Sequence, residues 1–263
     1  MSREVMRLHC LGVGPGWPCA ERNASAFLYQ WGATTALCDC GEPVTRRLKA
    51  LGAPLESIDH VLLTHLHFDH VGGLFFFLQG CWVERRRRPL TIHAPAHGIP
   101  ALREMLRQGF TLDALLPFSL TWRAWTPGRP VALADDARVT AWPTSHLDGL
   151  RERYPDEMPR GSLAVALLLE AGGRRIVHSG DLGAPEDLAP LLTSPADLLV
   201  VELGHFPPGR LLDFLVAHPP RRLALVHLAV EWWPERRRIE EDFRRRLPRT
   251  EVSVPTDGAV LDL

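Results

Sequence analysis

The 263-residue chain lacks any uninterrupted apolar run near the roughly 20 residues that a membrane-spanning helix requires. Its first residues, MSREVMRLHCLGVG, also lack the long apolar core of a signal peptide. Cysteine is scarce: the five cysteines include Cys38 and Cys40 as C-D-C, without a C-x-x-C pair or the regular spacing of a disulfide framework. Reduced thiols in the cytoplasm fit this pattern, and a membrane partner is not expected.

Lysine is almost absent, since Lys49 is the only one, and the formal net charge is −1. This balance excludes a global field that would draw the chain to nucleic acid or to an anionic membrane. Three arginine runs remain, at 85–88, 236–238 and 244–246. We expect the first to form a solvated turn and the others to lie on the polar face of a helix, rather than to anchor phosphate.

Short apolar segments alternate with segments of helical spacing along the whole chain. The pattern predicts strands at 5–13, 26–29, 35–38, 60–64, 90–93, 138–142, 163–170, 175–179, 198–202, 222–227 and 252–254. Helices are predicted at 43–51, 73–78, 99–108, 211–217 and 234–247. This alternation favours an α/β fold in which helices pack outside sheets. Because no stretch resembles a flexible linker or a repeat, we expect a single domain over 1–263.

The stretch THLHFDHVGG, residues 64–73, places four potential metal ligands in six positions. We expect these residues in a loop between a strand that ends at Thr64 and a helix that starts near Gly73. His65 and His67 are two apart, so both rings face the same side of an extended segment. Neutral imidazole together with carboxylate suits zinc and other first-row divalent ions. A histidine-rich surface loop, or core histidines bonded to carbonyls, would be the purely structural alternative.

The pattern H-x-H-x-D-H, followed by two glycines, resembles the signature of the metallo-β-lactamase superfamily. That resemblance implies a four-layer αβ/βα sandwich with one or two metals at the edge of two sheets. Further candidate ligands follow in chain order: His146 in W-P-T-S-H, Asp181 in V-H-S-G-D and His227 in A-L-V-H-L. The closing V-P-T-D-G-A-V-L-D-L is similar to the family's final strands, so the resemblance covers nearly the whole length.

The resemblance also implies two divalent cations, with zinc as the first choice and Mn²⁺ or Fe²⁺ as alternatives. One ion would be held by His65, His67 and His146, the other by Asp69, His70 and His227, with Asp181 shared. Many β-lactamases of the superfamily have cysteine at the position of Asp181. The aspartate therefore favours hydrolases of phosphodiesters, thioesters and lactones over antibiotic cleavage.

Two N-terminal patterns, E-R-N-A-S-A-F-L-Y and L-C-D-C-G-E, look like the start of the ribonuclease Z and phosphodiesterase branch. Asp39, Gly41 and Glu42 fit that branch's D-x-G-E turn, although a hairpin made only for chain reversal would look similar. The branch's long basic arm for transfer RNA is absent. The segment from His146 to Asp181 has room for a short loop and two strands only, so structured tRNA is not an expected partner.

The branch also carries a histidine-glutamate pair, in which the histidine protonates the leaving group. Glu202 is present here, but Val201 stands where that histidine would be. His205 is expected to replace it, with a surface or supporting histidine as the alternative. Asp69 is the expected general base. Asp39 and Glu202 are expected to orient metal-bound imidazoles.

These features predict a metal-dependent hydrolase in which a metal-bridging hydroxide attacks a phosphodiester of a small molecule or nucleotide. A lactonase or thioesterase with the same site is the second hypothesis. A non-hydrolytic protein, either an iron redox protein or one resembling the metallo-β-lactamase member of PQQ biosynthesis, is the third. Most of the tryptophans are expected to pack in the core, and a place in the wall of the substrate pocket is the alternative for Trp232 or Trp233. The sequence leaves a homodimer open.

Overall fold

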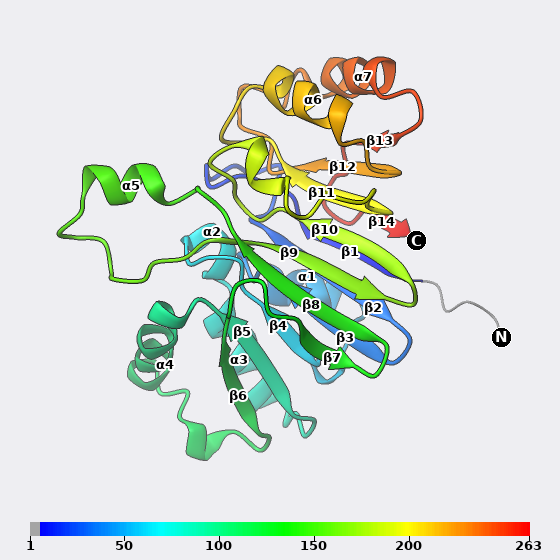
Figure 1. Cartoon of the computed structure of the whole chain (residues 1–263). Helices are drawn as coiled ribbons and strands as arrows, with labels where there is room; N and C mark the ends of the chain where they lie inside the picture. The colour runs from blue at the N-terminus through cyan, green and yellow to red at the C-terminus, as the bar shows by residue number, and fades with distance from the viewer. Residues whose placement is uncertain (1–5) are drawn as a thin grey trace.

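The computed structural model describes residues 6–263, which form two seven-stranded sheets stacked face to face (Figure 1). In the first sheet the strand order is β14 (Val260–Asp262), β1 (Arg7–Gly12), β2 (Ala26–Trp31), β3 (Thr34–Cys38), β4 (His60–Leu62), β5 (Leu90–Ala94) and β6 (Leu120–Ala124). In the second it is β13 (Glu251–Ser253), β12 (Arg222–Val226), β11 (Leu198–Glu202), β10 (Arg174–His178), β9 (Val165–Ala171), β8 (Ala137–Pro143) and β7 (Val131–Ala134).

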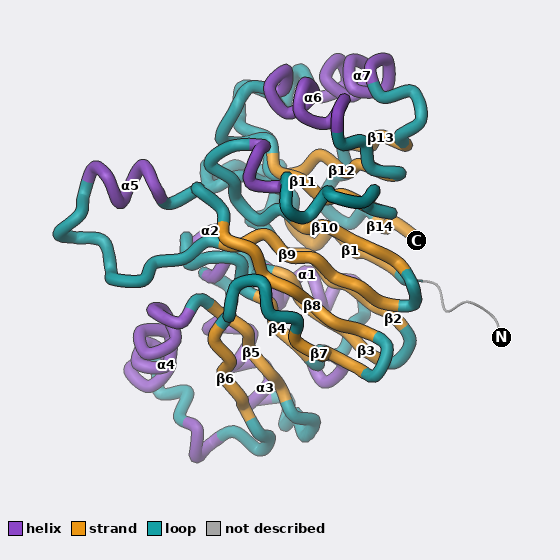
Figure 2. Tube along the Cα trace, viewed as in Figure 1, coloured by secondary structure: helices purple, strands orange, loops and turns teal. Residues whose placement is uncertain are grey.

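Helices cover the outer face of each sheet (Figure 2). The helices are α1 (Val44–Leu51), α2 (Phe68–Val71), α3 (Leu74–Val83), α4 (Ile99–Gln108), α5 (Asp148–Arg153), α6 (Pro208–Ala217) and α7 (Arg236–Arg246). Apolar residues of α1, α3 and α4 pack with the first sheet, and those of α6 and α7 pack with the second. A third apolar cluster takes its residues from both sheets and lies between them. The predicted four-layer sandwich is thus confirmed.

Strand periodicity explains how one sheet serves two apolar layers. Along β2, Phe27 and Tyr29 belong to the cluster between the sheets, whereas Leu28 belongs to the cluster beneath the helices. Side chains alternate between the two faces of a strand, so a strand buried on both faces must be apolar at nearly every position. This is why the sequence shows continuous apolar runs here rather than a polar–apolar alternation.

Parallel pairing places the functional loops at one edge of the sandwich. Strands β3, β4, β5 and β6 run parallel in the first sheet, and β10, β11, β12 and β13 do so in the second. The carboxyl ends of parallel strands meet at the same edge, where open α/β sheets bind their ligands. Asp39, His65, Asp181 and His227 each follow such a strand within a few residues.

Several elements differ from the sequence-based expectation. Strands β6 and β7 and helices α2 and α5 were not predicted as such, because they are short and, α2 apart, at most partly buried. Strand β14 lies in the closing stretch that was expected to form the final strands. The segment between His146 and β9 was expected to hold only a loop, yet it carries α5, which extends away from the body (Figure 1). Arg151 in α5 pairs with Asp148 and donates to the Ser162 carbonyl at 3.0 Å, which folds the segment back on itself. Val5, where the first predicted strand begins, lies outside the described residues.

The arginine run at 85–88 is not wholly a solvated turn, and this corrects the expectation. Arg86 is only 1% exposed. Its guanidinium donates to the carbonyls of Leu55, Ile58, Arg88 and Pro89 at 2.5 to 2.8 Å. Five donors in a planar fork can satisfy several carbonyls at once, which lysine could not do. Arg86 therefore joins the turn after α3 to the segment before β4.

Within residues 6–263, no helix is both long enough and apolar enough to cross a membrane.

Candidate metal centre

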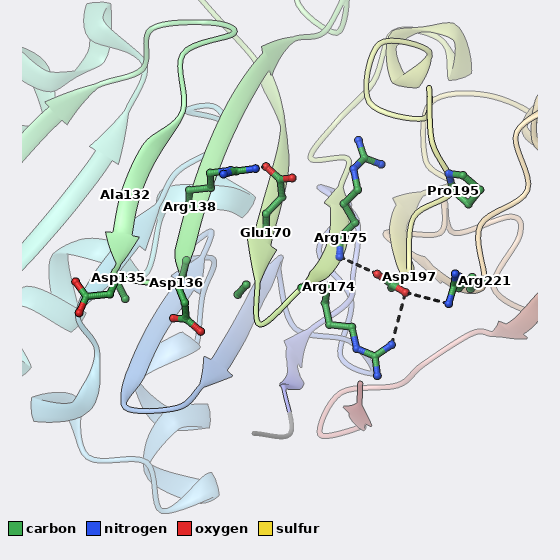
Figure 3. Close-up of a pocket in the computed structure, with 14 residues that line it drawn as sticks. Ala132, Asp135, Asp136, Arg138, Glu170, Arg174, Arg175, Pro195, Asp197 and Arg221 are labelled. Atoms are coloured by element: carbon green, nitrogen blue, oxygen red, sulfur yellow. Dashed lines mark hydrogen bonds and ion pairs between the residues drawn. The ribbon is translucent and has the colours of Figure 1, made fainter. Parts of the chain in front are cut away.

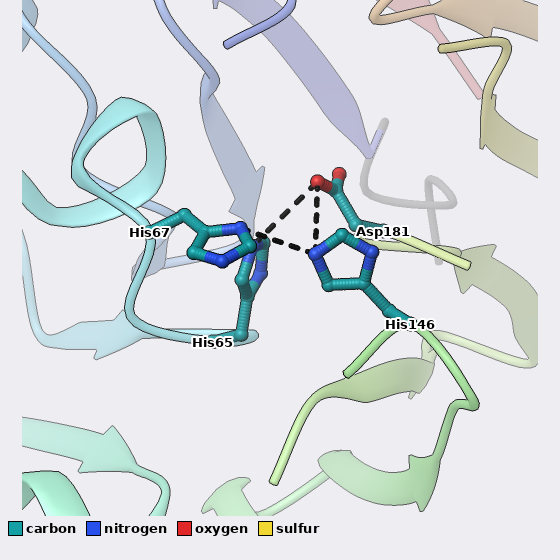
Figure 4. Close-up of side chains that lie close together, drawn as sticks. All are labelled: His65, His67, His146 and Asp181. Carbon is teal, nitrogen blue, oxygen red and sulfur yellow. Dashed lines mark hydrogen bonds and ion pairs between the residues drawn. The ribbon is translucent and has the colours of Figure 1, made fainter. Parts of the chain in front are cut away.

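The residues predicted to hold the first metal come together from three separate segments, which follow β4, β8 and β10. Nε2 of His65 and Nε2 of His146 each lie 3.1 Å from Nδ1 of His67 (Figure 4). Oδ2 of Asp181 lies 3.6 Å from Nε2 of His65 and 3.7 Å from Nε2 of His146. Three imidazole nitrogens and one carboxylate oxygen thus face a common point.

The residues predicted to hold the second metal form an adjoining cluster. Oδ2 of Asp69 lies 3.2 Å from Nε2 of His227 and 3.3 Å from Nε2 of His70. Oδ1 of Asp181 lies 3.2 Å from Nε2 of His70 and 3.7 Å from Nε2 of His227. The two oxygens of Asp181 therefore face different clusters, as a bridging ligand would.

Two observations test whether these residues fit divalent cations. Four ligands around zinc at about 2.0–2.1 Å lie roughly 3.3–3.4 Å from one another, and the separations given above bracket that value. Nε2 of His70 and Oδ1 of Asp181 are buried without a hydrogen-bond partner among the described residues. Leaving buried polar atoms unpaired costs about 1–3 kcal/mol each, and a coordinated cation would satisfy both. The donor set fits the predicted metals.

The electrostatics of the second cluster also favour a positive charge. Burial by itself would lower the pKa of His70, but the carboxylates of Asp181 and Asp39 outweigh it and raise that pKa well above 6.5. Burial by itself would raise the pKa of Asp69, but hydrogen bonds from His227 and His70 outweigh it and lower that pKa far below its usual value. The second cluster therefore stabilises positive charge, either as a proton on His70 or as a divalent cation in place of that proton.

Local backbone geometry explains how six consecutive residues serve two clusters. After β4 the chain stays extended through His67, which precedes α2 with φ −63° and ψ 147°. Asp69 and His70 lie in α2 and not in a loop as expected, and the helical turn directs them to the second cluster. Gly41 permits this approach, because a Cβ there would lie 2.2 Å from the backbone oxygen of Asp69.

Asp39 supports the second cluster from beneath. Its Oδ2 accepts a hydrogen bond of 2.7 Å from Nδ1 of His70, and its Oδ1 accepts one of 2.8 Å from the backbone N–H of Thr64. Such a bond fixes the tautomer and orientation of a ligating imidazole. The predicted D-x-G-E turn thus contributes Asp39 and Gly41 to the site, whereas Glu42 is exposed.

Glu202 and His205 form a pair at the rim of the centre. The Glu202 carboxylate is buried and accepts hydrogen bonds from Nδ1 of His205 at 2.8 Å and from the backbone N–H of Leu182 at 2.9 Å. Nε2 of His205 points inward and lies 3.9 Å from Oδ2 of Asp181. Glu202 therefore orients His205 and not a ligand imidazole, which corrects part of the expectation. Burial lowers the pKa of His205, but Glu202 outweighs it and raises that pKa.

Sequence reasoning missed one carboxylate that braces the ligand loops. Asp187 accepts hydrogen bonds from the backbone N–H of Ser145 at 3.0 Å and from that of Gly183 at 3.0 Å. It thereby ties the loop carrying His146 to the loop carrying Asp181. Nothing in the local sequence A-P-E-D-L distinguishes this aspartate from an ordinary loop residue, because its partners are 42 positions and 4 positions away.

A pocket lies beside the metal centre. A hollow of about 270 Å³ is lined by Trp17, His205, His227, Val230 and Glu231 among others. Trp232 and Trp233 do not line it; both pack against the apolar cluster outside the second sheet. The sequence could not predict Trp17 as a pocket residue, because a lone tryptophan in a Gly–Pro turn does not indicate which distant residues lie beside it.

A larger hollow of about 510 Å³ lies away from the metal ligands, beside the hairpin ends of the second sheet (Figure 3). Most of its charged side chains interact with one another: Arg138 pairs with Glu170 at 2.7 Å, and Arg174 and Arg221 pair with Asp197 at 3.6 Å each. None of its lining residues belongs to a cluster with metal-ligand geometry. The chemistry of the described chain is therefore concentrated at the opposite edge.

Comparison with known proteins agrees with this geometry. The family described as "Beta-lactamase superfamily domain" matches residues 34–228. Ribonuclease Z of Bradyrhizobium sp. (strain ORS 278) is 34% identical over 75% of this chain and 77% of its own length. The anti-Pycsar protein Apyc1 of Saccharibacillus brassicae is 30% identical over 76% of this chain and 90% of its own.

Among solved structures, the metallo-β-lactamase fold protein YhfI of Bacillus subtilis superposes with a TM-score of 0.79. The two chains are 20% identical, and the superposition covers 99% of this chain and 100% of YhfI. At this identity the likeness concerns the fold alone.

Proposed function

We propose that this chain is a phosphodiesterase. It belongs to the metallo-β-lactamase superfamily and, within it, to the ribonuclease Z-like branch, and it is a metal-dependent hydrolase. In this proposal two divalent cations, zinc as first choice, serve the hydrolysis of a phosphodiester in a small nucleotide. The observation that carries it is the position of Asp181, whose two oxygens face two separate sets of ligands. A single-metal site would not need a carboxylate so placed.

Two divalent cations between these ligands would lower the pKa of a water molecule and stabilise negative charge on the phosphoryl oxygens. The remaining steps belong to side chains of the chain itself. Asp69 places Oδ2 in the second cluster, while no hydrogen bond reaches its Oδ1 from residues 6–263. We assign to Oδ1 the orientation of the attacking water and the acceptance of its proton.

His205 is assigned to the leaving group. Its Nδ1 is held by Glu202 at 2.8 Å, so Nε2 is the nitrogen left to meet the substrate. The imidazole ring lies 4.6 Å from the ring of His146 and 5.8 Å from that of His227, centroid to centroid, and so stands beside both clusters. A proton held at Nε2 would pass to the leaving oxygen as the phosphorus–oxygen bond breaks.

A phosphodiester is favoured over an acyl substrate by the relatives, which include proteins named ribonuclease Z over most of the chain. A small nucleotide is favoured over structured RNA by the segment between His146 and β9. That segment holds only the six-residue helix α5 and a loop whose charged residues are Asp156, Glu157 and Arg160. Neither feature offers the extended basic surface that the phosphates of a folded RNA would require.

A substrate panel tests this proposal. Purified protein should hydrolyse bis-p-nitrophenyl phosphate and cyclic nucleotides, lose that activity on chelation and regain it with zinc. Asp181→Asn should abolish turnover, whereas Asp136→Asn, at an exposed position in the distant hollow, should leave it unchanged. Turnover of lactones or thioesters without turnover of any phosphodiester would reject the proposal in favour of acyl chemistry.

A further inference from the structure

We propose that the loop 14–22, with Trp17 near its tip, forms one wall of a nucleoside-binding subsite beside the metal centre. In this subsite the base of the substrate stacks on the Trp17 indole, and a ring amine or ribose hydroxyl donates to Glu231. The inference rests on the proposed phosphodiesterase function, since it names the part of the substrate next to the scissile phosphate.

Trp17 is placed for such contact. It is 67% exposed, although burying an indole is among the most favourable contributions a side chain makes to folding. It lines the 270 Å³ hollow together with His205 and His227, so the exposed ring borders the metal centre rather than a remote surface. The loop also passes close to the ligands, because a Cβ on Gly16 would lie 3.2 Å from Oδ2 of Asp69.

Hydrogen bonds fix both ends of the loop 14–22, so the loop is ordered before a ligand binds. Asp257, near the end of the chain, accepts hydrogen bonds from the backbone N–H of Val13 at 3.0 Å and from that of Asn23 at 2.7 Å. The N–H of Gly14 donates to the carbonyl of Asn23 at 2.7 Å. One carboxylate therefore clamps both ends of the loop, and a pre-ordered aromatic ring loses little entropy when a base stacks on it.

The opposite wall is tied to the same loop. Nη1 of Arg22 donates to the carbonyl of Leu228 at 2.6 Å, and its guanidinium lies 4.3 Å from the centre of the Trp233 ring. Arg236 stacks on that ring as well, at 4.6 Å. These contacts hold the segment that follows His227, which brings Val230 and Glu231 to the hollow. The two walls are thus connected through Arg22.

The lining chemistry indicates what the subsite binds. None of the residues that line the hollow is arginine or lysine, so it offers no anchor for a second phosphate. Glu231 carries a carboxylate without an ion pair or hydrogen bond within residues 6–263, and it would repel an anion but accept N–H and O–H donors. The volume is just below the roughly 300–1,000 Å³ of pockets that enclose whole drug-sized ligands, which suits one nucleoside. A flat ring with donor groups fits all three features.

Equilibrium binding tests the subsite without turnover. Titration calorimetry on the metal-loaded protein would compare adenosine 5′-monophosphate with ribose 5-phosphate, which has the same phosphate but no base. The wild type should bind the nucleotide more tightly. Trp17→Ala should weaken nucleotide binding roughly 5- to 150-fold, the range for loss of one base-stacking aromatic side chain, and leave ribose 5-phosphate unchanged. Trp17→Phe should restore most of the difference.

Phe110→Ala serves as the matched control, since Phe110 is a 77% exposed aromatic residue that does not line the hollow. Equal affinity for the two ligands in the wild type, no measurable nucleotide binding, or equal losses for Trp17→Ala and Phe110→Ala would each overturn the subsite. A base-dependent difference that persists in a protein without phosphodiesterase activity would support the subsite while rejecting the proposed reaction.

Discussion

Nδ1 of His70 donates a hydrogen bond of 2.7 Å to Oδ2 of Asp39, a carboxylate with no exposed surface. The bond leaves Nε2 of His70 free to face Asp69 and Asp181. Asp39 has φ 57°, a backbone conformation that asparagine also tolerates, so Asp39→Asn removes the charge without straining the turn.

We expect Asp39→Asn to weaken binding of one of two metal ions by roughly 10- to 100-fold, the usual effect of losing a carboxylate behind a ligating imidazole. Competition with a chromophoric chelator would measure this affinity. Asp136→Asn provides the control. Unchanged metal affinity in Asp39→Asn would show that His70 needs no support from this carboxylate.

His205 should matter in proportion to the basicity of the leaving group. His205→Ala is expected to slow hydrolysis of a cyclic nucleotide, whose leaving alkoxide needs a proton, by roughly 10²- to 10⁴-fold. Hydrolysis of bis-p-nitrophenyl phosphate should fall far less, because p-nitrophenolate leaves without protonation. Comparing kcat for both substrates separates proton donation from a loss of metal or fold. An equal decrease for the two substrates would remove His205 from this role.

Arg86 should contribute to stability and its neighbour Arg87 should not. Arg86→Ala leaves four carbonyls without their donor, two of them on the buried residues Leu55 and Ile58, and hydrogen bonds to a charged group contribute roughly 1.5–3 kcal/mol each. We expect a loss of more than about 3 kcal/mol in the free energy of unfolding, measured by urea denaturation. Arg87 has an exposed side chain, so Arg87→Ala should change it by less than about 0.5 kcal/mol. Similar values for both variants would refute the assignment.

Acid should destabilise the fold through His93, which is buried against Trp125 and lies 3.4 Å from His60, Nε2 to Nδ1. Burial, with His60 and Arg123 nearby, lowers the pKa of His93 to about 3. In the unfolded chain the His93 imidazole is protonated near pH 6.5, whereas in the folded chain it stays neutral until the pH approaches 3. The contribution of neutral His93 is therefore complete above pH 6.5 and is lost as the pH falls through that interval.

The slope of stability against pH should be smaller in His93→Gln than in the wild type. The expected difference between pH 6 and 4 is at most about 1.4 kcal/mol per pH unit, the value for one proton. Urea unfolding at several pH values would measure it. The seven candidate metal ligands are the same in both proteins, so their own titration cancels in the comparison. Parallel pH profiles would contradict the assignment.

Much of the metal centre could be predicted because its signal is local. Four ligands stand within six positions, and the other three each follow an apolar run that ends at the same edge of a sheet. Strands that are buried on both faces could also be predicted, because they appear in the sequence as continuous apolar runs. The four-layer fold followed from the resemblance that these residues carry.

The missing parts depend on contacts between distant residues. Trp17 borders the centre because Asp257, 244 positions from Val13, clamps the loop that carries it. Arg86 looked solvated within R-R-R-R, yet its carbonyl partners lie up to 31 positions away. The mostly exposed strand β6 and helix α5 lack the apolar periodicity on which such predictions depend.

The bridging position of Asp181 is the central claim, and counting metal ions tests it most directly. Plasma mass spectrometry would compare the wild type, purified without added metal, with His67→Ala and His70→Ala, each of which removes a ligand from one cluster only. We predict about two divalent ions per wild-type chain, as in two-metal hydrolases, and about one in each variant. One ion in the wild type that only one of these substitutions removes, or no ion at all, would contradict the shared site.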